Sequence, residues 1–131
     1  MEHPGRCHCG ALRFSFRSDK ALSPRACQCG FCRRHGARTV GDPEGSVTFV
    51  LNGSLLDYRF GLEVGEPLLC AACGVYLGVR QMIDGAAYAT LNLNAFETDW
   101  SGLAAEPVSY DSESAAARSE RRRLNWTPVS A

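Results

Sequence analysis

The chain has 131 residues, a length that fits one domain with a modest core. Its 14 basic and 14 acidic residues cancel, so no overall field directs it toward nucleic acid or an anionic membrane. No run approaches the roughly 18 apolar residues of a membrane span, and the start at Met1-Glu2-His3-Pro4 lacks the segments of a signal peptide. We expect a cytoplasmic protein with one domain, residues 1–131, no membrane partner and no nucleic-acid partner.

The N-terminal segment carries a first pair of cysteines and then a strand. Cys7 and Cys9 are followed by a glycine, which permits the tight turn that aims backbone amides at sulfur. Residues 11–17 alternate apolar and polar, which is the period of a half-buried strand. We expect the side chain of His8 to point away from a metal held by its neighbours, and His3 to lie in a frayed terminus.

A triplet of cysteines and a basic segment follow the strand. The triplet, residues 27–32, places three thiols within six residues. Arg33 and Arg34 come directly after it, and they either offset the charge of metal-bound thiolates or hold an anionic substrate. His35 is a candidate fourth ligand, although a lone histidine beside a metal site is more often a neighbour than a ligand.

Two hairpins are predicted in the middle of the chain. The first joins residues 47–51 to residues 55–60 through the turn signal Asn52-Gly53. The second joins residues 75–83 to residues 86–93 through Asp84-Gly85, which is the strongest hairpin signal in the sequence.

A second pair of cysteines, Cys70 and Cys73, lies between these hairpins. Leu68-Leu69 precede the pair, so it begins at the end of a strand, and Gly74 closes its turn. A C-x-x-C turn of this kind is a common zinc-binding knuckle.

The C-terminal part predicts a short helix. Residues 112–124 are rich in Ala, Glu and Arg, with Ser112 and Ser114 as candidate N-caps. The run Arg121–Arg123 is expected to be a solvated helix end, where basic side chains interact favourably with the helix dipole. We expect Trp126 to pack the tail against the domain.

All seven cysteines can be assigned to two metal ions. Clustered C-x-C and C-x-x-C spacing without a signal peptide favours metal ligation over disulfides, and thiolate ligands favour zinc over iron–sulfur or copper(I). One partition gives a closed site and an open three-thiol site: Cys7, Cys9, Cys70 and Cys73 against Cys27, Cys29 and Cys32. The other partition forms a zinc ribbon from Cys29, Cys32, Cys70 and Cys73, and leaves a second metal site with Cys7, Cys9 and Cys27.

Three motifs together resemble the glutathione-dependent formaldehyde-activating enzyme and centromere protein V family. They are Cys7-His8-Cys9-Gly10-Ala11-Leu12-Arg13-Phe14, the Cys27, Cys29, Cys32 triplet followed by Arg33, and Cys70-Ala71-Ala72-Cys73-Gly74. The resemblance covers about residues 5–97, so residues 98–131 form a C-terminal extension.

The resemblance implies a mainly antiparallel β fold of the β-tent type with two zinc ions. By the same resemblance, Cys7, Cys9, Cys70 and Cys73 match the structural zinc ligands, and Cys27, Cys29 and Cys32 match the catalytic ones. The implied activity is that of a carbon–sulfur lyase, in which glutathione or a similar thiol adds to formaldehyde or another small aldehyde, or the reverse. Arg33 or Arg34 is then a candidate for holding a glutathione carboxylate.

Two other functions are compatible with the same cysteines. A zinc-stabilised protein-binding module would use both metals for structure, and His35 would then close the second site. A redox sensor would release zinc when the triplet is oxidised.

Overall fold

The computed structural model describes residues 1–130 as two β-sheets with few helices. The strands are β1 (Glu2–Arg6), β2 (Leu12–Arg17), β3 (Arg25–Cys27), β4 (Thr39–Val40), β5 (Ser46–Leu51), β6 (Glu66–Leu69), β7 (Tyr76–Ile83), β8 (Ala86–Asn92), β9 (Glu106–Val108) and β10 (Thr127–Pro128). The helices are α1 (Gly30–His35), α2 (Ala115–Asn125) and a 3-10 turn at Leu93–Ala95. Among these residues, no helix is both long and apolar enough to span a membrane.

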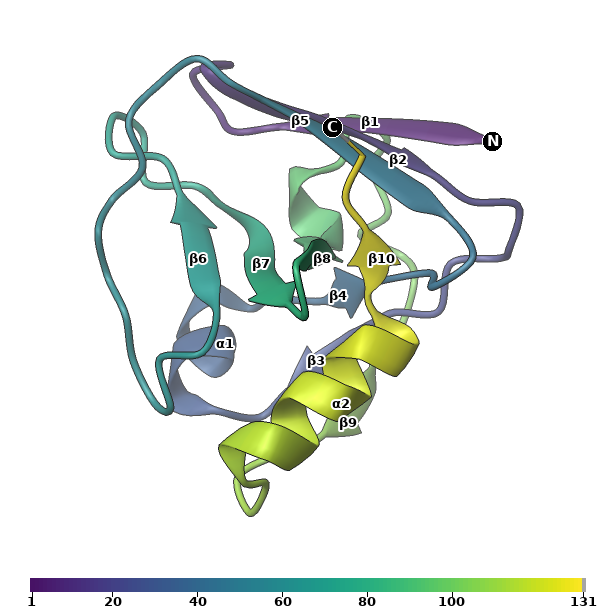
Figure 1. Ribbon diagram of the computed structural model, residues 1–131. Coiled ribbons are helices and arrows are strands. Elements are labelled where there is room, and N and C mark those ends of the chain that lie inside the picture. The colour runs from purple at the N-terminus through teal and green to yellow at the C-terminus, as the bar shows by residue number, and fades with distance from the viewer. Residues whose placement is uncertain (131) are drawn as a thin grey trace.

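The smaller sheet has the order β1-β2-β5, and all its pairs are antiparallel (Figure 1). Leu12, Phe14 and Phe16 of β2 are buried, while the arginines between and after them are exposed. The alternation in residues 11–17 therefore predicted this strand and its buried face.

The larger sheet has the order β6-β7-β8-β4-β3-β9, and β10 also pairs with β8. The β7–β8 hairpin is confirmed, and its two turn residues, Asp84 and Gly85, both have positive φ (50° and 83°), as a type I′ turn requires. Every pair of strands in this sheet is antiparallel except β3 with β9. The mainly β, largely antiparallel architecture expected of a β-tent is confirmed.

The predicted hairpin between residues 47–51 and 55–60 is wrong. The first segment is β5, but it pairs with β2, where Phe49 lies opposite Phe14. The second segment makes only an isolated bridge from Leu55 to Cys70. Neither Asn52 nor Gly53 has the positive φ that a type I′ turn needs, and β5 is bridged to Val129 of the C-terminal segment as well as paired with β2.

The main core contains buried residues of both sheets, including Phe16 and Val47 from the smaller sheet and Leu68, Leu77 and Leu91 from the larger one. His3 belongs to this region rather than to a frayed end, so that expectation is wrong. β1 pairs along β2, and the imidazole ring lies 5.9 Å from the ring centres of both Phe16 and Phe96.

The C-terminal helix is confirmed as α2, with the side chain of Ser114 accepting a hydrogen bond from the amide of Ala117 (3.1 Å). After α2 the chain crosses back through β10 to the smaller sheet, and Trp126 is buried at the junction (Figure 1). The expectation of a solvated arginine run holds only for Arg123. Arg121 and Arg122 are half-buried, because this face of α2 turns toward the larger sheet.

Candidate metal centres and active-site cavity

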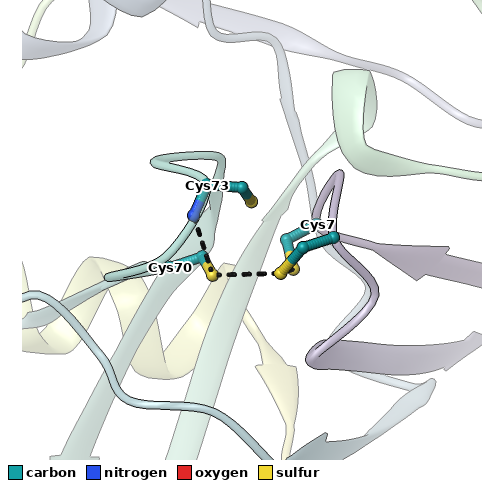
Figure 2. Close-up of side chains that lie close together, drawn as sticks. Cys7, Cys70 and Cys73 are labelled. Carbon is teal, nitrogen blue, oxygen red and sulfur yellow. Dashed lines mark hydrogen bonds between the residues drawn. The ribbon is translucent and has the colours of Figure 1, made fainter.

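Four of the cysteines converge on one point between the two sheets. Cys7 and Cys9 come from the turn between β1 and β2, and Cys70 and Cys73 come from the knuckle after β6 (Figure 2). Their sulfurs all lie within 4.8 Å of one another, with Cys9 Sγ at 3.6 Å from both Cys7 Sγ and Cys70 Sγ. Zinc–sulfur bonds of about 2.3 Å at tetrahedral angles would separate the sulfurs by about 3.8 Å. His8 is exposed and contributes no ligand atom to this group.

Backbone amides surround these sulfurs. The amide of Leu12 donates a hydrogen bond to Cys7 Sγ (3.4 Å). The amide of Cys73 donates one to Cys70 Sγ (3.5 Å), which is drawn as a dashed line in Figure 2. Gly74 reaches this geometry with a φ of 80°. The backbone amides of Cys9 and Val75 lower the pKa of the Cys73 thiol to about 6. The turns therefore stabilise thiolate, which is the form that binds metal.

The other three cysteines form a separate group on the segment from β3 to α1. Cys27 ends β3, Cys29 is the N-cap of α1 and Cys32 lies in its first turn. Their sulfurs also lie within 4.8 Å of one another, and the amide of Cys32 donates to Cys29 Sγ (3.3 Å). The zinc-ribbon partition is therefore not the one that the structure forms.

The three thiols share their protons unequally. A hydrogen bond from Cys32 lowers the pKa of Cys27 to about 5, while the same bond, together with burial, raises the pKa of Cys32. Three thiolates this close repel one another, so all three ionise together only when a cation lies between them. Both cysteine groups can hold a metal ion, and their donor sets suit zinc.

His35 does not complete the three-thiol group. Its side chain is exposed, and its ring packs against Phe31 with the ring centres 4.5 Å apart. Within residues 1–130, the set of candidate ligand atoms around this point consists of the three sulfurs alone. A metal ion bound there would keep a coordination position for another ligand.

All three cysteines of this group line a cavity of about 410 Å³. Its walls come from β3, β9, α1, β7 and α2, and in the view of Figure 1 α2 lies in front of β3 and β9. Tyr76 and Phe60 lie on one wall, and Arg122 and Trp126 lie on another. Burial raises the pKa of Tyr76, and the charges of the three cysteines add to that rise, so the phenol lies within their field.

The two arginines that directly follow the triplet do not reach the cavity, although Arg25, which precedes it, does. Arg33 donates to the backbone carbonyl of Gln28 and Arg34 to that of Gly30, and neither lines the cavity. Three arginines of the C-terminal extension do line it: Arg118, Arg121 and Arg122. Sequence reasoning missed this role, although their i, i+3, i+4 spacing on a predicted helix placed them on one face.

No family model matches the chain. The structure is similar to the crystal structure of a Rhodobacter sphaeroides protein determined as a structural-genomics target. The two share 26% sequence identity with a TM-score of 0.61, over 82% of this chain and 99% of that one. This two-sheet architecture therefore also occurs in an experimentally determined structure.

Proposed function

We propose that the chain is a zinc-dependent enzyme of the carbon–sulfur lyase type that adds a small thiol to a small aldehyde, or catalyses the reverse. The observation that carries the proposal is the three-thiol group of Cys27, Cys29 and Cys32 on the wall of a 410 Å³ cavity. A purely structural zinc site is normally closed by four protein ligands, as the other cysteine group is. Three ligands and an adjoining cavity are typical of a catalytic site.

The two groups would then bind two zinc ions with different roles. Zinc held by three thiolates lowers the pKa of an added thiol and keeps it as thiolate, the form that attacks carbonyl carbon. The resemblance of the cysteine motifs to the formaldehyde-activating family supports glutathione as the thiol and formaldehyde as the aldehyde. The proposal includes a cytoplasmic setting, where thiols remain reduced and able to bind metal.

The reaction forms one carbon–sulfur bond and moves one proton. The sulfur lone pair attacks the carbonyl carbon, the carbonyl π electrons move to oxygen, and the thiol proton ends on that oxygen. Tyr76 lines the cavity and is a phenol at neutral pH, because the pKa of tyrosine is ordinarily about 10 and burial raises it further. Its hydroxyl group can therefore donate a hydrogen bond to the oxygen as negative charge develops there.

Cobalt substitution followed by titration with glutathione tests the proposal, because the visible spectrum of cobalt reports its ligands. We expect two bound cobalt ions per chain, of which one changes its spectrum when thiol is added, and formation of the S-hydroxymethyl adduct when formaldehyde follows. Two cobalt sites that both ignore small thiols would contradict the proposal and favour the non-catalytic protein-binding module.

A further inference from the structure

Arg122 lies in an unusual environment on the cavity wall. Its guanidinium group lies over the ring of Trp126, 4.4 Å from the ring centre, and donates to Gln81 Oε1 (2.8 Å). Its Nε atom is buried without a hydrogen-bond partner in residues 1–130. A buried polar group without a partner is costly, so contacts within the described residues satisfy the Arg122 guanidinium group only in part.

The charge of Arg122 is also unpaired, whereas its neighbours on α2 are paired. Arg118 and Arg121 both form ion pairs with Glu113, at 3.3 Å and 2.7 Å. Arg123 forms one with Glu120 at 2.7 Å. Over residues 1–130, no carboxylate lies within ion-pair distance of Arg122.

Burial lowers the pKa of Arg122 to about 10, which still leaves the guanidinium group positive at neutral pH. A half-buried cation without an anion is destabilising, so the group favours an anionic ligand.

The cavity around Arg122 suits a small organic anion. A Cβ atom at Gly65 would lie 2.8 Å from Arg122 Nη1, so glycine at that position lets the guanidinium group keep its place on the cavity wall. Phe60, Val79 and Trp126 add apolar surface to the same cavity. The planar fork of a guanidinium group matches the two oxygens of a carboxylate better than an ammonium group does.

We propose, building on the proposed thiol-activating site, that Arg122 binds the carboxylate of the thiol substrate while the sulfur of that substrate points to Cys27, Cys29 and Cys32. The substrate class is then a carboxylate-bearing small thiol. The C-terminal extension supplies the residue that recognises it, because α2 lies outside residues 5–97.

Two thiols of nearly equal size test this assignment: 3-mercaptopropionate, which carries a carboxylate, and 3-mercaptopropionamide, which does not. Each is titrated into the cobalt-substituted protein and followed by the visible spectrum. We expect the carboxylate form to bind about tenfold more tightly to the wild type, the effect of one charge-assisted hydrogen bond. Arg122→Gln should remove this preference while binding of the amide stays unchanged. The matched control, Arg123→Gln, changes an exposed arginine one position along and should keep the preference.

A second measurement needs neither variant nor metal chemistry. Propionate and propionamide are titrated into the wild-type protein while the indole N–H resonance of Trp126 is followed by NMR. We expect only propionate to shift it, because the ring lies against Arg122. Equal responses to both compounds, or a carboxylate preference that survives in Arg122→Gln, would overturn the assignment. If propionate shifts Trp126 but neither thiol changes the cobalt spectrum, the anion site stands and the thiol-activating function fails.

Discussion

The two cysteine groups use the same ligand atom but differ in how they are built into the fold. In the four-thiol group, Cys9 and Cys70 are 61 residues apart, and their sulfurs join the turn of the smaller sheet to a strand of the larger one. In the three-thiol group, all ligands come from one six-residue segment that is half-buried beside a cavity. A metal that closes a long loop stabilises the fold much more than one bound within a short segment. The comparison therefore predicts that a metal in the first group stabilises the fold, whereas the second group is the one to which the proposed chemistry belongs.

The largest effect expected from this difference is that of Cys73→Ser. Loss of one thiolate from the group that links the sheets should lower the free energy of unfolding by about 4 kcal/mol or more, because the metal-binding energy is part of the folding energy. Thermal unfolding followed by circular dichroism, with metal content measured on the same samples, checks it. A variant that keeps two metals and the wild-type melting temperature would contradict the structural role.

Cys32→Ser should give the opposite result. The chain should keep its fold and the metal of the four-thiol group, lose the second metal and lose its response to thiols. The free energy of unfolding should change by about 1 kcal/mol, within the range of an ordinary substitution. Metal content, melting temperature and the cobalt spectrum with glutathione are measured side by side with Cys73→Ser. If both substitutions unfold the chain to the same degree, the division between the two groups is wrong.

A smaller effect is expected from Tyr76→Phe, which should change the turnover rate at the three-thiol group without changing thiol binding. Tyr76→Phe should lower the turnover rate by about 100-fold, the usual cost of removing one donor to a developing oxyanion. Thiol binding to the cobalt-substituted protein should not change, because the phenol acts on the aldehyde oxygen. Tyr58→Phe is the matched control, since Tyr58 is exposed and does not line the cavity. Equal rates for the wild type and Tyr76→Phe would remove Tyr76 from the mechanism.

Sequence patterns of a few residues predicted the elements that depend only on neighbouring residues. The turn at Asp84-Gly85 needs positive φ at both positions, and Asp and Gly adopt it more readily than most residues. The two residues therefore predicted the β7–β8 hairpin from the sequence alone. The seven cysteines predicted two metal sites, but their spacing alone permitted two partitions. The resemblance implied the first partition, and the packing of the two sheets, which brings Cys7 to Cys70, confirms that grouping of the sulfurs.

Features that depend on distant packing were not predictable in the same way. Asn52-Gly53 predicted a hairpin turn, but neither residue has the positive φ of a type I′ turn, and β5 pairs with β2 and not with residues 55–60. Arg33 and Arg34 were chosen because they adjoin the triplet in sequence. Arg122 lies 90 positions after Cys32 in the sequence. It lines the same cavity because β10, which follows α2, pairs with β8 and so holds α2 beside the larger sheet.

The smallest predicted effect is the contribution of His3 to the pH dependence of stability. His3 lies outside both cysteine groups, so its contribution must be measured apart from the titration of the thiols. Burial lowers the pKa of His3, and the positive N-terminus adds to that effect. The unfolded chain therefore binds the proton first as the pH falls below about 6.5, and stability that is present above that value is progressively lost. Substitution of His3 by Leu should reduce the fall in melting temperature between pH 7.5 and pH 6, measured with excess zinc so that the thiolates stay metal-bound. His8→Leu, which changes an exposed histidine, should keep the wild-type slope. If His3→Leu has the wild-type slope too, His3 is not the source of the pH dependence in this range.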